Sequence, residues 1–390
     1  MQSHADSRQL PGASIAITRG ADLVYTHCCG QRSVETGAPF ELDTVVRIFS
    51  MTKPITSVAL MTLVERGLIH LDAPVSDVLP EFSNMQALIS GAHHIDQTEP
   101  CPAPTLHQLL THTAGMSYPF NAGPLPRAME DAQLLFKPDQ GRLADMVTTL
   151  SALPLAFQPG TRWEYSVATD VLGRVVEVVI GKTLGEVFQE DIFGPLGMGQ
   201  TGFAISPAGQ SKLASLYTPL EGDIFAFNTG VLGQNPLRLV EDANNTAYAS
   251  PQMQSGGGGL LSTLHDYLRF ADMLRNGGTG GGHRILSPGT VAFMMQNHLS
   301  GDIASMGPSS FAEQPMEGMG FGLGGAVVLD PARARCIGSV GDFSWGGMAS
   351  TFFWVDPTLR LSVVFMTQLA PSNSYPLRSQ IKSLVHSALG

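Results

Sequence analysis

The sequence predicts an α+β protein with an antiparallel sheet, flanked by helices, built from both chain ends, and an all-helical lobe from the middle. Extended, β-branched segments lie near the N-terminus and again beyond residue 320, and helical spacings fill the region between them. At 390 residues the chain is too long for one ordinary core. We therefore expect an α/β lobe from residues 1–72 and 256–390, and a mainly helical lobe from residues 73–255 that shapes a cleft.

The N-terminal part is predicted to form a hairpin followed by a long helix. Residues 13–18 and 23–29 are extended segments separated by a short glycine-containing turn, which is typical of a β-hairpin. Residues 44–48 are again rich in β-branched side chains. From Ser50 to residue 66 the apolar residues recur at helical spacing, and Gly67 then supplies the glycine that commonly ends a helix.

The remainder of the chain is predicted to run through several helices and then return to strands. Ser262 is expected to cap a helix that ends near residue 274. We expect the first hairpin to pair with the last strands, with the C-terminal helix and the Ser50 helix covering the two faces of the sheet. The other predicted helices span residues 105–110, 142–153, 168–180 and 375–389, and the predicted strands span residues 321–329, 335–340, 351–356 and 360–367.

Composition excludes several classes of function. Hydrophobic residues make up 43% of the chain and charged residues only 14%, which allows a large core. The formal net charge of −11 leaves no broad basic face, so we expect no nucleic acid partner. A surface so poor in charge favours self-association, so the sequence allows a homo-oligomer.

Neither a membrane nor a metal is predicted. The first residues lack the basic and apolar runs of a signal peptide, and no apolar stretch approaches about 18 residues. We therefore expect a cytoplasmic protein with no membrane partner. The four cysteines have no metal-binding spacing, and His93-His94 lacks the spacing of helical ligands.

Ser50 and Lys53 are the first candidates for chemistry. A serine hydroxyl is a weak nucleophile until a neighbouring group takes its proton, and residues at positions i and i+3 of a helix share one face. No serine carries glycines in the G-x-S-x-G pattern that usually marks a histidine-assisted nucleophile. The S-x-x-K pattern also occurs at Ser379 and Lys382, which we expect to be an exposed face of an ordinary helix.

Two later segments strengthen the case for Ser50. Tyr165 follows a loop and precedes a predicted helix, where a tyrosine can face a cleft or simply pack in the core. Trp345-Gly346-Gly347 precedes a predicted strand. Glycines beside an edge strand let a ligand approach the backbone, although such a segment is also typical of a plain hairpin turn.

Together, residues 50–53, 165–167 and 345–347 resemble the motifs of the class C β-lactamase and penicillin-binding-protein superfamily, most of all its esterase branch, the family VIII carboxylesterases. Residues 109–115 and 256–259 resemble secondary signatures of the same family. The resemblance implies a beta-lactamase-like fold and an acyl-enzyme on Ser50. It also implies that Lys53 and Tyr165 share the base role, although the sequence leaves open which of them is deprotonated at rest. No cofactor is implied.

The same resemblance implies an oxyanion hole and a substrate class. The backbone N–H groups of Ser50 and Met348 would hold the oxyanion. Trp345 replaces the lysine of the K-T-G motif and Val167 replaces the asparagine of Y-x-N, so the cleft should be more apolar than that of a lactamase. With Gly346 and Gly347 these residues are expected to bind a small-molecule ester, neutral and with a short acyl group.

Several alternatives stay open at this point. The same fold could carry a beta-lactamase, an amidase or D-aminopeptidase, or an acyltransferase. A non-catalytic ligand-binding relative is a different class of protein that the sequence also allows. A Ser-His-Asp hydrolase would instead have to use His112, His265 or His298.

Overall fold

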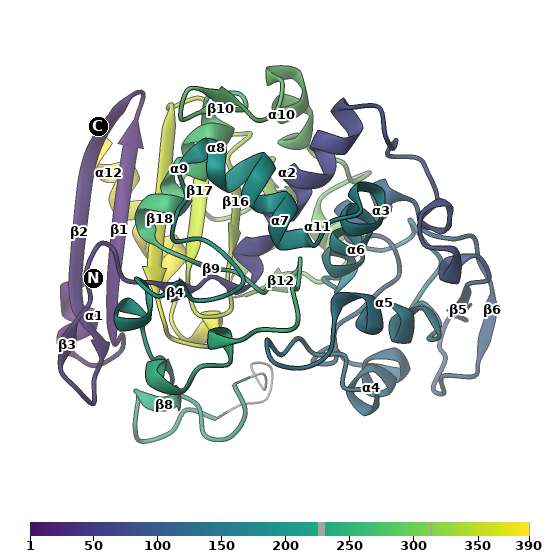
Figure 1. Cartoon of the computed structure of the whole chain (residues 1–390), viewed down its shortest axis with the longest axis horizontal. Helices are drawn as coiled ribbons and strands as arrows, with labels where there is room; N and C mark the ends of the chain where they lie inside the picture. The colour runs from purple at the N-terminus through teal and green to yellow at the C-terminus, as the bar shows by residue number, and fades with distance from the viewer. Residues whose placement is uncertain (225–230, 313, 390) are drawn as a thin grey trace.

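An eight-stranded antiparallel sheet forms one side of the molecule (Figure 1). The structure is a computed structural model that describes residues 1–224, 231–312 and 314–389. The strand order is β14-β15-β16-β17-β18-β1-β2-β3, so strands from both chain ends share one sheet, as predicted. The strands of this sheet are β1 (Gly12–Arg19), β2 (Asp22–Ser33), β3 (Ala38–Pro39), β14 (Met319–Phe321), β15 (Ala326–Val328), β16 (Phe343–Gly346), β17 (Phe352–Asp356) and β18 (Leu361–Thr367).

The pairing of β1 with β18 joins the two ends of the chain. The register runs from Ala13 opposite Thr367 to Arg19 opposite Leu361. β1 is buried along nearly its whole length, because it is a central strand with helices on both of its faces. β2 returns as the second arm of the predicted hairpin and lies nearer the edge, where most of its side chains are exposed or half-buried.

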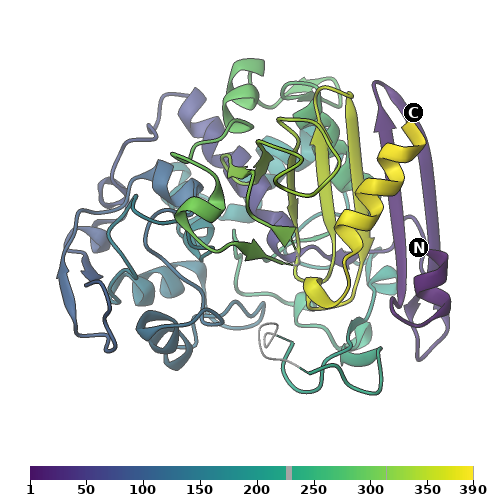
Figure 2. The same ribbon diagram turned by 180° about the vertical axis from the view of Figure 1, so that it is seen from behind.

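Helices cover both faces of the sheet, although one of them is not the predicted helix. On one face α12 packs its residues Leu377, Ile381 and Val385 against β17 and β18 (Figure 2). On the other face lies α9, where the ring of Tyr267 sits 5.1 Å from that of Phe353. The helices of the protein are α1 (Gln2–Asp6), α2 (Thr52–Glu65), α3 (Leu106–Leu110), α4 (Pro124–Asp131), α5 (Leu143–Ser151), α6 (Ala168–Ile180), α7 (Leu184–Phe188), α8 (Gly194–Leu196), α9 (Leu264–Arg275), α10 (Pro288–Met294), α11 (Ile303–Met306) and α12 (Leu377–Leu389).

The helix that follows Ser50 lies one layer deeper than predicted. α2 packs mainly on α6 and α7, and every residue from Thr52 to Leu63 is buried. A helix buried on all sides needs neighbours all round, so α2 serves as the central helix of the molecule rather than as a cover for the sheet. Its buried hydroxyls find local acceptors, as Thr56 Oγ1 does in donating to the carbonyl of Gly256 at 2.7 Å.

Some predicted elements near the C-terminus are wrong in detail. The single strand expected over residues 321–329 is a hairpin, because Gly324 takes a φ of +98° between β14 and β15. Residues 335–340 form turns instead of a strand, and Arg335 has a φ of +51°. Ser262 lies in a short strand, and it is Thr263 whose side chain accepts from the N–H of Asp266 to cap α9.

The middle of the chain supplies the helices on the other side of Figure 1. The predicted helices over residues 105–110 and 168–180 match α3 and α6, and Thr105 forms a capping box with Gln108 at the start of α3. The remaining strands pair as β4 (Val46–Arg47) with β9 (Leu261–Ser262), β5 (Gln86–Leu88) with β6 (Thr98–Pro100), β7 (Leu216–Thr218) with β8 (Arg238–Glu241), β10 (Thr279–Gly280) with β11 (His283–Arg284), and β12 (Ser310–Phe311) with β13 (Gln314–Pro315).

The division into lobes at residues 72 and 255 stays a proposal. One apolar cluster runs without interruption from the sheet into the helices. Part of the middle segment also contacts the sheet directly, because the N–H of Tyr217 in β7 donates to the carbonyl of Gln368 at 3.0 Å. Among the described helices, none combines the length and the apolar character that a membrane crossing requires.

Arg47 ties three distant segments together just before Ser50. Its guanidinium is fully buried and donates to Glu241 at 2.6 Å and to the carbonyl of Ala214 at 2.7 Å. The N–H of Arg47 donates to the side chain of Gln368, which follows β18. A buried guanidinium needs such partners because an unpaired buried charge is costly.

We expect Glu241→Ala to lower the free energy of unfolding by about 2 to 4 kcal/mol, because it leaves Arg47 buried without its carboxylate. The matched control is Glu41→Ala, which removes the exposed partner of Arg32 and should cost no more than about 1 kcal/mol. Urea unfolding of both variants measures the difference. Equal losses of the free energy of unfolding in the two variants would show that the buried Arg47–Glu241 pair contributes no more to stability than the exposed pair.

Candidate active site

Ser50 sits at a sharp turn between β4 and α2. It belongs to a 3-10 turn, Phe49–Met51, so the α-helix begins two residues later than the sequence predicts. Phe49 has a φ of +42°, a conformation that a bulky residue adopts only when its surroundings hold it. This turn exposes the Ser50 hydroxyl to a cavity, while the residues on either side of the turn are buried.

The structure brings Ser50, Lys53 and Tyr165 together. A hydrogen bond of 2.5 Å joins the hydroxyl of Tyr165 to Oγ of Ser50. Nζ of Lys53 lies 3.5 Å from the same Oγ. Tyr165 lies three residues before the start of α6, which packs on α2, and this contact between helices sets the distance between the three side chains.

Lys53 is held by groups that the sequence analysis did not identify. Only 1% of its surface is exposed, and Nζ donates to the hydroxyl of Tyr118 at 2.8 Å and to the carbonyl of Gly257 at 2.7 Å. The ammonium also lies 4.6 Å from the ring centre of Tyr165. These contacts leave the amine little freedom to turn away from Ser50.

Two buried groups complete the surroundings of Lys53. Burial raises the pKa of Tyr118 well above its usual value, so this phenol stays protonated at neutral pH. Burial also raises the pKa of Asp170, although the charge of Lys53 opposes the rise. Asp170 accepts from Ser255 Oγ at 2.5 Å and from the N–H of Gly257 at 3.0 Å, which fixes the loop that binds Lys53.

No local pattern could have revealed Tyr118, Asp170 and Gly257 as partners of Lys53. They come from three segments that meet only where α2 packs on α6. Gly257 lies in the glycine run of residues 256–259, and Tyr118 follows the segment of residues 109–115. Both of those segments carried a family resemblance, and that was the one available signal.

The segment around Trp345 lies in the sheet rather than in a hairpin turn. Trp345 and Gly346 belong to β16, with β15 on one side and β17 on the other. The pairing with β15 ends at Ser344, so the backbone of the next two residues borders the cavity on that side. A ligand can therefore reach this backbone although the strand is not at the edge of the sheet.

Gly347 brings the end of β16 against the turn that carries Ser50. A Cβ atom at this position would lie 2.2 Å from the carbonyl oxygen of Ile48. The N–H of Gly347 is already used, because it donates to the carbonyl of Thr351 at 2.8 Å. The N–H of the next residue, Met348, has no acceptor within the described part of the chain, and Met348 lines the cavity.

The N–H of Ser50 is a second candidate backbone donor, next to the N–H of Met348. Ser50 lies in the first turn of its helix, where N–H groups have no acceptor inside the helix. The two groups come from opposite sides of the contact between Gly347 and Ile48. Ser50 and Met348 both line the cavity, so their backbone N–H groups stay the candidate oxyanion hole that the family resemblance implies.

A cavity of about 440 Å³ opens onto these groups. Trp345, Gly346, Gly347 and Val167 all line it, as the sequence analysis expected of substrate-binding residues. Trp345 stacks with Phe311 at 5.8 Å and lies 5.4 Å from the ring of Tyr165. Other apolar side chains of the wall include Phe120, Leu135, Phe136, Met146 and Met316.

None of the three candidate histidines contacts the hydroxyl of Ser50. His112 is buried beside Tyr165, with ring centres 5.0 Å apart, and its Nδ1 lies 3.1 Å from Ser166 Oγ. His298 pairs with His107 at 3.1 Å, and His265 lies half-buried on α9. Within the described residues, the titratable side chains hydrogen-bonded to Ser50 Oγ are those of Tyr165 and Lys53.

The second S-x-x-K pair does not form a comparable site. Ser379 is partly exposed and donates to the carbonyl of Pro376. Lys382 is buried, contrary to the expectation of an exposed helix face, and donates to Asp342 at 2.7 Å. The two side chains of this pair therefore face different surroundings and do not cooperate.

Comparisons with known proteins agree with this geometry. The beta-lactamase family profile matches residues 1–383. The chain is 32% identical to esterase EstB from Burkholderia gladioli, over 97% of this chain and 91% of that one. It is 31% identical to the acyltransferase calJ from Penicillium decumbens, over 92% of this chain and 84% of that one.

Solved structures give the same result for the fold. EstCE1, a hydrolase with promiscuous acyltransferase activity, superposes with a TM-score of 0.80 and 28% identity, over 98% of this chain and 96% of that one. The comparisons confirm the beta-lactamase-like fold and the family resemblance that the three motifs predicted.

Gly347→Ala should slow the reaction of Ser50 with a fluorophosphonate at least about 100-fold, because the new methyl group forces β16 away from the serine turn and displaces a backbone donor. Gly199→Ala is the matched control, since that glycine has open space around it. Mass spectrometry of the labelled peptide measures both rates. A labelling rate unchanged by Gly347→Ala would contradict the close-contact argument.

His112 should make the protein less stable in acid. Burial, together with the nearby Lys53 charge, holds the pKa of His112 well below its usual value of 6.5. Below pH about 6.5 the imidazole of His112 is protonated in the unfolded chain but stays neutral in the folded chain. The free energy of unfolding therefore falls by up to about 1.4 kcal/mol per pH unit until the folded pKa is reached.

His112→Asn removes this titration and suits the φ of +57° at the position. Urea unfolding at pH 7.5, 6.5 and 5.5 measures the free energy of unfolding of both proteins. The difference between wild type and variant, called the gap below, should narrow as the pH falls. The exposed His283, replaced by glutamine, provides the control, for which the gap should stay constant. A constant gap for His112→Asn as well would count against the assignment.

Proposed function

The chain belongs to the beta-lactamase family, and we propose that it is a carboxylesterase that hydrolyses small, neutral, short-acyl esters through an acyl-enzyme on Ser50. The observation that carries the proposal is the hydrogen bond of 2.5 Å between Ser50 Oγ and the hydroxyl of Tyr165, with Lys53 Nζ 3.5 Å away, at the wall of an apolar cavity. The similarity to esterase EstB supports the same reaction class.

In the acylation step Ser50 Oγ attacks the carbonyl carbon of the ester. The serine proton passes to the pair formed by Tyr165 and Lys53, which lie next to each other. The oxyanion of the tetrahedral intermediate accepts hydrogen bonds from the N–H groups of Ser50 and Met348. The carbon–oxygen bond of the ester then breaks, and Tyr165 returns the proton to the departing alcohol.

Deacylation repeats these steps with water. The pair of Tyr165 and Lys53 takes a proton from a water molecule, which attacks the acyl carbon. The bond between this carbon and Ser50 Oγ breaks, and the serine recovers its proton. Tyr118 and the carbonyl of Gly257 act as positioning groups, since they hold Lys53 and do not contact the reacting atoms.

The lining of the cavity supports neutral substrates. Trp345 carries no charge where a lactamase motif has lysine, and Val167 offers no amide to a lactam side chain. The beta-lactamase alternative is supported by Arg378 of α12, a cation that lines the part of the cavity next to Gly346. The substrate panel described below therefore includes a lactam.

Acyl transfer is the second candidate function. An alcohol that replaces water in deacylation would take the acyl group from Ser50 with no change in the catalytic groups. The similarity to EstCE1 and to calJ favours this possibility. Addition of a short alcohol to the ester assay separates the two outcomes, because transfer yields a new ester and hydrolysis yields the free acid.

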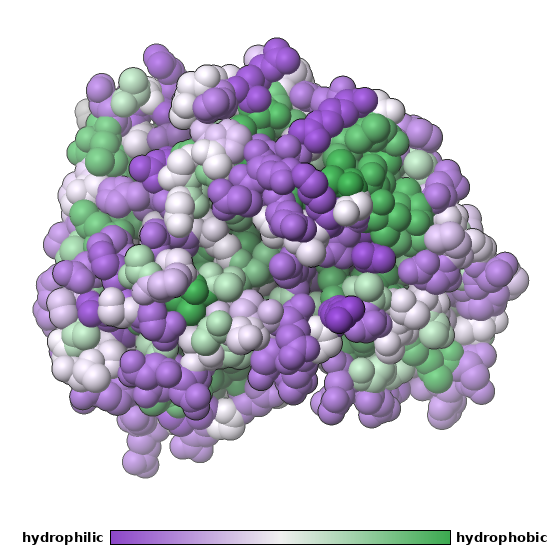
Figure 3. Space-filling model, viewed as in Figure 1, coloured by the Kyte–Doolittle hydropathy of each residue, from purple (hydrophilic) through white to green (hydrophobic). Residues whose placement is uncertain are grey.

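The remaining expectations stay proposals. Amide or D-peptide hydrolysis would use the same acyl-enzyme with a different leaving group, and a non-catalytic ligand-binding relative would show no turnover. A cytoplasmic location is one of these proposals. A homo-oligomer has some support in Figure 3, where hydrophobic residues gather at the upper right of a mainly hydrophilic face.

We expect Ser50→Ala, Lys53→Met and Tyr165→Phe each to lower kcat for p-nitrophenyl acetate by at least about 1,000-fold while the protein stays folded. Ser379→Ala should leave kcat within about twofold of wild type, since it alters the second S-x-x-K pair. A panel of p-nitrophenyl esters, amino-acid amides and nitrocefin then ranks the substrate classes. Faster turnover of nitrocefin than of short esters would overturn the esterase proposal.

A further inference from the structure

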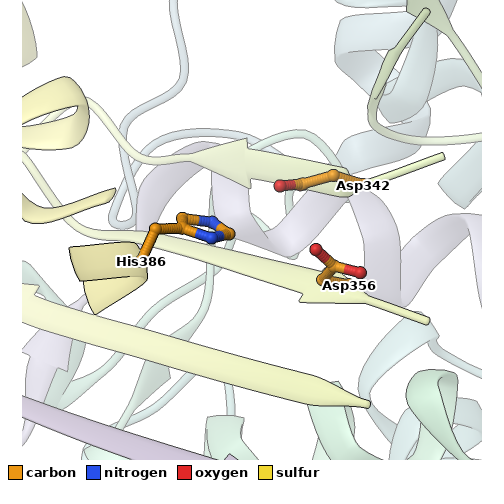
Figure 4. A group of neighbouring side chains, drawn as sticks. All are labelled: Asp342, Asp356 and His386. Atoms are coloured by element: carbon orange, nitrogen blue, oxygen red, sulfur yellow. The ribbon is translucent and has the colours of Figure 1, made fainter. Parts of the chain in front are cut away.

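A second cluster of chemically active side chains lies on the opposite face of the sheet, beneath α12. Asp342 precedes β16, Asp356 ends β17, and His386 comes from α12. One ligand atom from each lies within 4.8 Å of the others. Figure 4 shows the three side chains pointing toward one another across the space between the two strands and the helix.

The three atoms that converge here have no protein partner. Asp342 Oδ1, Asp356 Oδ2 and His386 Nε2 are buried and make no hydrogen bond within the described residues. Both aspartates are 0% exposed. Leaving a buried polar atom without a partner is costly, so three such atoms around one space point to a ligand that contacts all three.

The other oxygen of each aspartate is already engaged. Asp342 Oδ2 accepts from Lys382 Nζ at 2.7 Å, and Asp356 Oδ1 accepts from the N–H of Leu359 at 2.9 Å. Each carboxylate is thus oriented by an outer partner and turns its free oxygen inward. Metal ligands in proteins are typically held by outer partners in this way.

Charge also favours a cation in this space. Two carboxyl groups face this space, and within the described residues Lys382 is the one lysine or arginine hydrogen-bonded to either of them. A metal ion can accept a lone pair from each of the three groups, the imidazole included when its other nitrogen carries the proton. One imidazole with two carboxylates suits zinc better than calcium or magnesium, which prefer oxygen ligands alone.

We propose that Asp342, Asp356 and His386 form a structural Zn²⁺ site that fastens α12 to β16 and β17. Zinc bonds of about 2.0 to 2.2 Å would require the three side chains to draw slightly closer together. The ion would take no part in the chemistry at Ser50. It would stabilise β16, the strand that carries Trp345 and Gly346, from the far side. The ligands are widely separated in the sequence, which explains why their spacing predicted no metal.

The test measures zinc binding by the full-length protein after treatment with a chelator. Equilibrium dialysis against Zn²⁺, with metal analysis, should give one ion per chain, and the melting temperature should rise with the zinc concentration. Asp356→Asn and His386→Gln should each weaken binding at least about 100-fold. His283→Gln changes an exposed histidine of β11 that is not part of the cluster, and this variant should bind as the wild type does.

X-ray absorption of the zinc-loaded wild-type protein gives a second readout that needs no variant. We expect nitrogen and oxygen ligands at about 2.0 to 2.2 Å, with the signature of one imidazole and no sulfur. Substoichiometric binding by the wild type, equal binding by His386→Gln, or sulfur ligands near 2.3 Å would each overturn the proposal. Ester hydrolysis is measured separately, so the failure of either proposal leaves the other standing.

Discussion

The burial of Lys53 is the constraint on which the rest of the site depends. An amine with 1% of its surface exposed must find its partners inside the protein, because an uncompensated buried charge is costly. Those partners are Tyr118 and the carbonyl of Gly257, while Asp170 fixes the loop that contains Gly257. Three segments from different parts of the chain must therefore pack in one arrangement before Lys53 can be buried.

That arrangement also fixes the surroundings of Ser50. α2 carries Lys53, and α6 begins just after Tyr165, so the packing of these two helices sets how the serine meets its two neighbours. The sheet supplies the other wall, where Gly347 allows β16 to touch the carbonyl of Ile48. Arg47 connects the same turn to Glu241 and Gln368, which binds the serine turn to both the middle and the end of the chain.

The two proposals concern opposite faces of one strand. β16 presents Trp345 to the apolar cavity beside Ser50, and Asp342, which precedes it, faces α12 on the other side. A site that stabilises one face can hold the strand in place for the chemistry on the other. The two sites share no ligand atoms, so their functions are separable by substitution.

The sequence by itself determined the class of fold and the pairing of strands from both chain ends, and its family resemblance proposed Ser50, Lys53 and Tyr165 as a set. These features depend on local periodicity and on short motifs, which a single chain displays directly. Only the tertiary structure decided that α9 rather than α2 covers the sheet, that residues 321–329 turn back as a hairpin, and that Tyr118 holds Lys53. It alone gathered Asp342, Asp356 and His386 into one space. Such facts depend on contacts between residues far apart in the chain, and no local pattern encodes which distant segments will meet.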